Sequence, residues 1–183
     1  MTSEFVTKII GKYAPDEALR EIITVHSTMV AAKALSIVKA RHLEGEVDLQ
    51  FLEDAAMLHD IGIVEVDAPS IHCHGTRPYI CHGLAGAEIL AREGLPEAYQ
   101  RVCLRHTGAG ITAREIRENR LPLPEIDLVP ETLEERLICY ADKFFSKSRD
   151  LRYEKTMEEA ERSVRKFGEE SYGRFLSMKN EFR

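Results

Sequence analysis

The sequence has few cysteines, no excess of positive charge and no long apolar run. Its 25 lysines and arginines stand against 31 aspartates and glutamates, a formal net charge of −6. This balance argues against a general nucleic-acid binder or a protein of anionic membranes, because both depend on positive charge. No apolar run approaches about 20 residues, and the first residues lack the charged-then-apolar pattern of a signal peptide. We therefore expect a cytoplasmic protein with no membrane partner.

The cysteines also exclude a disulfide framework. Cys73, Cys81, Cys103 and Cys139 form no CxxC pair and no regular spacing, so they are expected to be thiols, with Cys103 and Cys139 as small core residues. A chain of 183 residues with 44% hydrophobic residues can form a core without covalent staples. No linker or repeat divides it, and we expect one domain over residues 1–183.

Helical periodicity runs through nearly the whole sequence. Apolar residues recur at steps of three and four in segments separated by proline, glycine and capping residues. The expected helices cover about 16–45, as one bent helix or two that end at Gly45, and then 48–60, 83–93, 96–106, 112–119, 131–147 and 156–182. No window alternates in the manner of a strand. The predicted fold class is all-α, a compact bundle of several helices.

Two stretches lose this period. Residues 63–82 contain Pro69, Gly75 and Pro78, and residues 121–130 read LPLPEIDLVP. Loops of such length within a compact domain are usually functional. The first also contains His72, Cys73, His74 and Cys81. These side chains could form a small structural zinc site, but their spacing does not match the usual pairs of ligands.

Histidine and aspartate stand near helix ends. His59 and Asp60 close an apolar segment and are followed by Ile61 and Gly62. Neighbours on a helix point about 100° apart, so both can reach one cation only near the helix terminus. His26 and Asp142 lie within apolar surroundings, where a carboxylate needs a cationic partner.

In these features the sequence resembles the HD-domain superfamily of metal-dependent phosphohydrolases. HDIG is written out at 59–62, ADK stands at 141–143, and the resemblance covers about residues 20–150. The ordered residues that carry it are His26, His59, Asp60, His82, His106 and Asp142.

The resemblance implies a role for each of these six positions. His26, His59, Asp60 and Asp142 match the ligands of a first metal. His82 and His106 match the histidines of subfamilies that hold a second metal, with Asp60 bridging the two ions. Imidazole and carboxylate ligands suit Mn, Fe, Co, Ni or Zn, with Mg as an alternative. Hydrolysis would then proceed by attack of a metal-bound hydroxide on phosphorus in a nucleotide or another small phosphorylated metabolite.

Lysine and arginine side chains near these positions are candidates for binding the substrate. Lys33 lies two helical turns after His26, and together with His59 and Asp60 it is expected to take part in catalysis. Arg77, Lys143 and Arg149 are candidate phosphate clamps, since guanidinium and ammonium groups match phosphate oxygens, and His74 is a candidate contact at the pocket mouth. Many relatives have lysine shortly after HDIG; here Ile63 and Val64 stand there.

Two other functions stay open at this point. The scaffold could hold metal and sense a phosphorylated ligand without turnover, or it could hold two iron ions and oxidise its substrate. The amphipathic segment at 156–182 is expected to pack on the body of the protein or on another subunit, which leaves a homo-oligomer among the alternatives.

Overall fold

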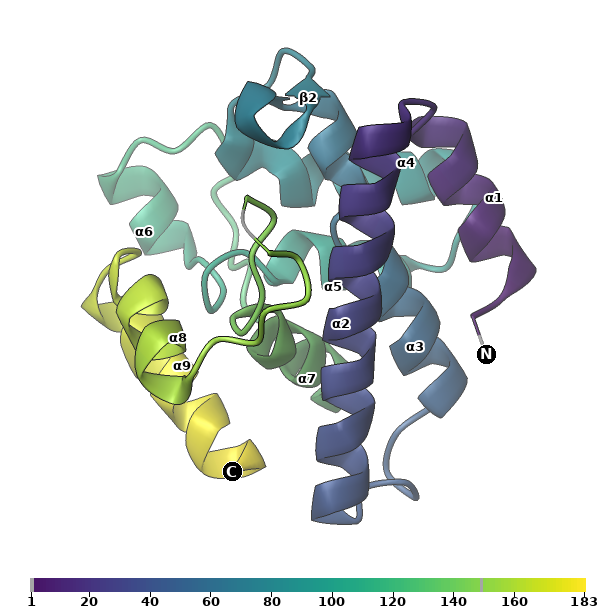
Figure 1. Ribbon diagram of the computed structural model, residues 1–183. Helices are drawn as coiled ribbons and strands as arrows, with labels where there is room; N and C mark the ends of the chain where they lie inside the picture. Colours follow the sequence, from purple (N-terminus) through teal and green to yellow (C-terminus); the bar gives the residue numbers. More distant parts are fainter. Residues whose placement is uncertain (1, 149) are drawn as a thin grey trace.

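The computed structural model describes residues 2–148 and 150–183, in which helices dominate (Figure 1). The elements are α1 (Glu4–Tyr13), α2 (Glu17–Arg41), α3 (Leu49–Leu58), η1 (Ile61–Glu65), β1 (Asp67–Ala68), η2 (Pro69–Ile71), β2 (Cys73–His74), η3 (Tyr79–Cys81), α4 (His82–Arg92), α5 (Glu97–Arg105), α6 (Ala113–Glu118), α7 (Leu133–Asp142), α8 (Met157–Arg165) and α9 (Glu169–Phe182). The predicted all-α class is confirmed. Helix α1 is an element that the sequence analysis did not anticipate.

Helix α2 runs through the middle of the molecule and packs against α3 and α7 (Figure 1). It is one helix rather than two. It begins where the Asp16 side chain accepts a hydrogen bond from the backbone N–H of Leu19, and it ends at His42, whose φ of 57° is left-handed. The helix therefore stops before Gly45. By length and composition α2 could cross a membrane, but here its buried face, which includes His26, belongs to the core.

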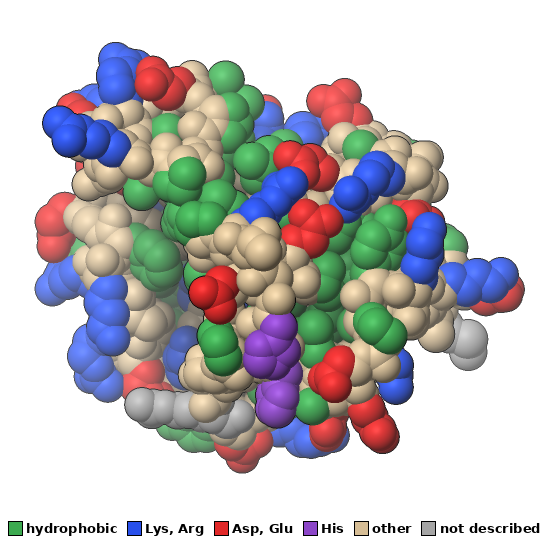
Figure 2. Space-filling model, turned by 90° about the horizontal axis from the view of Figure 1, so that it is seen from above, with side chains coloured by type: hydrophobic (Ala, Val, Ile, Leu, Met, Phe, Trp, Pro, Cys, Tyr) green, Lys and Arg blue, Asp and Glu red, His purple; other side chains and the backbone are tan. Residues whose placement is uncertain are grey.

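The segment expected as a loop at 63–82 contains short elements instead. Strands β1 and β2 pair antiparallel, with Asp67 opposite His74 and Ala68 opposite Cys73, and three short 3₁₀ helices lie before, between and after them. Figure 2 views this side of the molecule, and histidine side chains gather at its surface. His72 and His74 are the exposed histidines of this segment.

Helix α4 lies directly against η1, and glycine makes this approach possible. A Cβ atom on Gly62 would overlap the carbonyl oxygen of His82 and the backbone nitrogen of Gly86. Only a residue without a side chain therefore allows the two backbones to meet. This contact holds the end of α3, with His59 and Asp60, beside the start of α4.

Helix α7 is shorter at both ends than the predicted range 131–147. It starts at Thr132, whose side chain forms a capping box with Glu135. It ends at Asp142, where the N–H groups of residues 143, 144 and 145 bond back to the third carbonyl before each of them. This tightened last turn is a common way to satisfy terminal carbonyls, and the chain then leaves the helix axis.

The C-terminal segment forms two helices where one was predicted. Helix α8 ends at Arg165 and α9 begins at Glu169. Gly168 between them has a φ of 107°, which favours glycine and breaks the helix. Of the apolar residues in the amphipathic segment, Phe167 is exposed, whereas Phe175 and Phe182 are buried. Helix α9 packs on α7, and α8 packs on α9, so the pair lies on the body of the protein.

Candidate metal centre

The structure brings together six residues that lie up to 116 positions apart along the chain. They come from five places in the bundle: the middle of α2, the end of α3 (which supplies two of them), the start of α4, and the ends of α5 and α7. All six are buried. They are His26, His59, Asp60, His82, His106 and Asp142.

The first group consists of two histidines and two aspartates. The Nε2 atom of His26 lies 3.1 Å from Oδ2 of Asp60 and 3.0 Å from Oδ1 of Asp142. The Nε2 atom of His59 lies 3.1 Å and 3.5 Å from the same two oxygens. Two imidazole nitrogens and two carboxylate oxygens therefore point at one position, a donor set that suits a divalent transition metal.

The second group uses the other oxygen of Asp60. Its Oδ1 atom lies 3.2 Å from Nε2 of His106 and 3.6 Å from Nε2 of His82. The two imidazole Nε2 atoms are 3.0 Å apart. Asp60 is thus common to both groups, the position from which a single carboxylate can bridge two ions.

Backbone carbonyls fix the orientation of three of these rings. The Nδ1 atoms of His59, His82 and His106 lie 2.6, 2.7 and 2.8 Å from the carbonyl oxygens of the third residue before each of them. A carbonyl only accepts hydrogen bonds, so Nδ1 must carry a proton, and Nε2 is the ring nitrogen that faces the centre of the site. This arrangement is typical of histidines that bind metals.

Several atoms of these side chains lack a hydrogen bond that would satisfy them. In the part of the chain that the structure describes, Nε2 of His59 and both carboxylate oxygens of Asp60 are buried without a well-aligned hydrogen bond. Two Nε2 lone pairs 3.0 Å apart, on His82 and His106, would repel each other unless a proton or a cation lay between them. The residues present therefore fit divalent cations.

The closely packed charged groups of the site shift the pKa values of its side chains. Burial opposes protonation of His59, but the carboxylates of Asp60 and Asp142 outweigh it and raise the pKa of His59 to about 9. Burial and the neighbouring His106 lower the pKa of His82 to about 3. For Asp60, burial raises the pKa, but Lys147 and His59 lower it well below its usual value.

Lys147 is a residue of the site that sequence reasoning missed. Its Nζ atom lies 2.7 Å from Oδ2 of Asp60, and its side chain is only 13% exposed. Burial disfavours the ammonium, yet the carboxylate of Asp60 raises the pKa of Lys147 well above its usual value. The position of Lys147, five residues after Asp142, could have indicated its role. However, the helix predicted over 131–147 would have directed Lys147 away from Asp142.

Lys143 lies in the core beside the ligand residues. Its Nζ atom is 2.6 Å from Oδ2 of Asp142 and donates to the carbonyl of His106 at 2.9 Å. The ammonium thus holds an aspartate and the end of α5 together. Expected as a phosphate clamp, Lys143 has these two protein partners instead.

The other predicted substrate contacts lie apart from the six residues. Lys33 pairs with Glu154 at 2.5 Å, and Arg77 pairs with Glu88 at 2.7 Å and Glu65 at 3.4 Å. Among the described residues neither cation contacts any of the six, because an acidic neighbour lies nearer to each. His74 is exposed on β2, and Arg149 lies outside the described residues.

The loop cysteines and histidines do not assemble into a zinc site in the described structure. The two ligand groups found there include none of them. Cys73 is buried and donates to the carbonyl of Ile71, while Cys81 donates to that of Pro122. His72 and His74 point to the surface instead.

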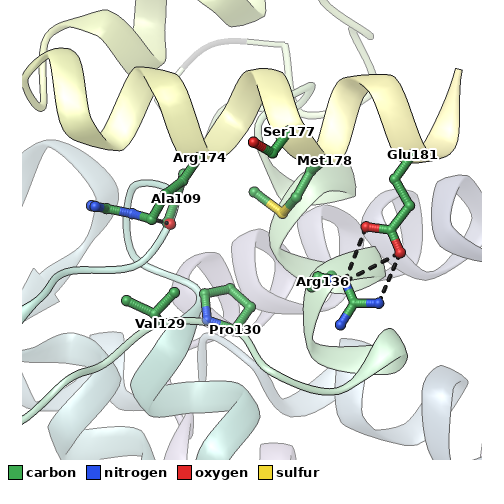
Figure 3. Close-up of a pocket in the computed structure, with 8 residues that line it drawn as sticks. All are labelled: Ala109, Val129, Pro130, Arg136, Arg174, Ser177, Met178 and Glu181. Carbon is green, nitrogen blue, oxygen red and sulfur yellow. Dashed lines mark hydrogen bonds and ion pairs between the residues drawn. The ribbon is translucent and has the colours of Figure 1, made fainter.

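A separate cavity of about 180 Å³ lies between α9 and the start of α7 (Figure 3). Its lining includes Met178 and the ion pair of Arg136 with Glu181, in which the shortest contact is 2.8 Å. Arg174 at its edge bonds to the carbonyls of Ala109 and Gly110. None of the six ligand residues lines this cavity, so it is distinct from the metal centre.

Comparison with protein families matches an HD domain model to residues 23–146, a range that contains all six ligand residues. The chain belongs to the HD domain family. A solved structure of the same fold, the HD domain of the phosphodiesterase PgpH from L. monocytogenes, superposes with a TM-score of 0.54. The superposition covers 96% of this chain and 95% of the other at 16% identity. At that identity the likeness concerns the fold.

Among curated proteins, this HD domain is similar to part of a tRNA (cytidine(56)-2′-O)-methyltransferase from Picrophilus torridus. The two are 36% identical over 114 residues, which are 62% of this chain and 30% of that protein. An uncharacterized protein from Methanocaldococcus jannaschii is 37% identical over 67% of this chain and 65% of its own length. The chain thus corresponds to under a third of the methyltransferase.

Proposed function

We propose that this HD domain hydrolyses a phosphate ester or phosphoanhydride bond in a nucleotide or another small phosphorylated metabolite. The observation that carries the proposal is the pair of Nε2 atoms of His82 and His106, 3.0 Å apart beside an Asp60 carboxylate that the first group shares. Membership of the HD domain family supports it.

When bound at these residues, divalent cations would supply Lewis acidity that acidifies water and stabilises charge on a phosphoryl group during in-line displacement. The protein's own contribution is orientation. Backbone carbonyls hold the rings of His59, His82 and His106 with Nε2 inward. Lys143 holds the Asp142 carboxylate in place, so the ligand atoms need little rearrangement when cations bind.

Lys147 adds a fixed positive charge to the same site. Its ammonium contacts Asp60, and a lysine so placed can also bind an oxygen of a substrate phosphate. Because the side chain of Lys147 is only 13% exposed, such a charge interacts more strongly with phosphate than the charge of a surface lysine would.

Similarity to a methyltransferase does not lead us to propose methyl transfer by this chain. The similar region is 30% of that protein, and the six ligand residues provide no reason to expect a methyl donor. We also propose that the protein acts on small molecules and not on nucleic acid, in keeping with its net charge of −6.

The test is hydrolysis by the protein stripped with chelator and then loaded separately with Mn, Fe, Co, Ni, Zn or Mg. Nucleotides, dinucleoside polyphosphates and an aryl phosphate serve as substrates. We expect phosphate or nucleotide release in at least one metal form, and its loss in Asp60→Asn. The exposed Asp67→Asn is the matched control and should keep full activity.

Loaded protein that hydrolyses none of these compounds in any metal form would overturn the proposal. Tight nucleotide binding without turnover would then favour a sensor. Mixed-valence iron that turns over with oxygen would favour oxidation instead.

A further inference from the structure

A cavity of about 410 Å³ borders the metal centre. Lys147, which contacts Asp60, and Tyr79, whose ring lies 4.8 Å from the ring of His82, are both in its wall. The cavity is therefore next to both ligand groups. Its size lies within the range of roughly 300–1,000 Å³ that is common for small-molecule sites.

The walls of this cavity, which we call the inner cavity, combine apolar and hydroxyl groups. Tyr79 and Phe145 provide aromatic surface, while Ser70, Ser146 and Ser148 provide hydroxyls beside the ammonium of Lys147. Hydroxyl and ammonium groups bind phosphate oxygens, and an aromatic ring binds a planar organic group. This chemistry fits a phosphate ester with a planar substituent, such as a nucleotide.

A second cavity of about 430 Å³ adjoins the inner one, and we call it the outer cavity. Ser146 and Ser148 line both cavities. They lie on the segment that joins α7 to α8, which loops between α2 and the α8–α9 pair (Figure 1). The opposite wall comes from α8 and its C-cap, and it includes Arg162 and Lys166.

Several charged groups that line the outer cavity already have hydrogen-bond partners within the protein. The carboxylate of Glu159 is bound by the backbone N–H of Thr156 and the hydroxyl of Tyr153. Asp150 accepts from the backbone N–H of Arg152, and Lys155 donates to two backbone carbonyls.

Arg162 and Lys166, by contrast, are exposed and make no hydrogen bond or direct ion pair among the described residues, although the charge of Arg162 helps to lower the pKa of its neighbours Glu158 and Glu159. Three cations and two acids line this cavity, a balance of +1 on a chain whose net charge is −6. The outer cavity therefore offers two exposed cations that make no direct ion pair with a described residue, on a chain whose net charge is negative.

We propose that the two cavities together hold one substrate with two separated anionic groups, a nucleotide that carries a second phosphate. The phosphate to be cleaved lies beside Lys147, and the second lies against Arg162 and Lys166. This inference rests on the proposed hydrolysis. It assigns substrate choice to α8, which lies outside the HD domain match at residues 23–146.

The experiment compares adenosine 3′,5′-bisphosphate with adenosine 5′-monophosphate on the metal-loaded full chain. In Arg162→Ala/Lys166→Ala we expect KM for the bisphosphate to rise about 10- to 100-fold, the loss typical of one or two charge-assisted contacts. The kcat for the bisphosphate and both constants for the monophosphate should stay unchanged. Arg162→Lys/Lys166→Arg should restore the KM.

The matched control is Lys8→Ala/Lys39→Ala, which removes the same charge from exposed positions on α1 and α2. Equal KM values for the α8 variant and this control would overturn the inference while leaving the proposed hydrolysis intact. If neither nucleotide is hydrolysed, calorimetry gives the binding constants directly. Weaker binding of the bisphosphate in the α8 variant alone would then support the inference although the proposed function had failed, and equal binding would overturn it.

Discussion

The ammonium of Lys147 lies 2.7 Å from the carboxylate of Asp60, the residue that the two ligand groups share. The contact depends on the end of α7 at Asp142, because the chain after that point turns back toward the site. A cation of the protein thus stands at the boundary between the metal centre and the inner cavity, where a substrate phosphate would lie.

This position predicts the effect of Lys147→Met, which keeps most of the side-chain length but removes the charge. We expect kcat/KM to fall about 10- to 100-fold, because a contact between an ammonium and a phosphate contributes roughly 1.5–3 kcal/mol. Metal content, measured by elemental analysis, should not fall. Lys33→Met is the control: Lys33 pairs with Glu154, and its loss should change kcat/KM less than threefold. Equal effects of the two substitutions would contradict the role of Lys147.

The two ligand groups predict the metal content of the protein. Wild type should hold two ions per chain, and His82→Ala/His106→Ala should hold one, because the first group keeps all four of its ligands. Elemental analysis of freshly purified protein measures this ratio. The exposed pair His72→Ala/His74→Ala should retain both ions. A double variant that loses no metal would show that His82 and His106 do not bind an ion.

Glu135 predicts how stability depends on pH. Burial raises the pKa of this carboxyl, but the backbone N–H of Glu131 and the guanidinium of Arg105 outweigh it and lower the pKa below the usual 4.5. Because the folded pKa is lower than the unfolded one, the stabilisation is present above about pH 4.5 and is lost as pH falls through the folded value.

Glu135→Gln should therefore lower the free energy of unfolding by about 1–3 kcal/mol at pH 7. The difference from wild type should shrink as pH falls below 4. Urea unfolding at a series of pH values measures both effects. The exposed Glu118→Gln should leave the free energy unchanged, and a loss in Glu135→Gln that did not vary with pH would contradict the electrostatic explanation.

Gly62 predicts a strong effect of a single methyl group. In Gly62→Ala the new Cβ would overlap backbone atoms of His82 and Gly86, which cannot move aside as a flexible side chain could. We expect loss of folded protein or destabilisation by about 3 kcal/mol or more. Gly11→Ala, where no atom lies within 4 Å of the new Cβ, should instead stabilise α1 by about 0.5–1 kcal/mol. Thermal unfolding followed by circular dichroism distinguishes the two.

Much of the architecture was predictable because local signals agree with the packing. A helix was expected to begin at residue 48, and the Asp48 side chain caps α3 by accepting from the N–H groups of Gln50 and Phe51. The ordered histidines and aspartates near helix ends indicated which side chains converge, and the structure places all six within reach of shared cations.

The errors arose where tertiary contacts decide the outcome. Apolar periodicity continued past Asp142 and past Arg165, so the ends of α7 and α8 were not apparent. Lys147 consequently went unnoticed. Lys33 and Arg77 looked suitable as phosphate contacts by type and position, but each pairs with a glutamate of another segment, Glu154 and Glu88 respectively. Spacing along a helix carries no information about such neighbours.

The location of the outer cavity places substrate recognition and metal binding on different parts of this chain. The residues proposed to bind cations lie on α2, α4 and α7 or directly after α3 and α5, whereas Arg162 and Lys166 lie on or directly after α8, in a helical hairpin that follows them. Replacement of two side chains on that hairpin could redirect the protein toward a different metabolite while its reactive centre stayed intact. Related chains could thus differ in substrate specificity while they retain the same catalytic residues.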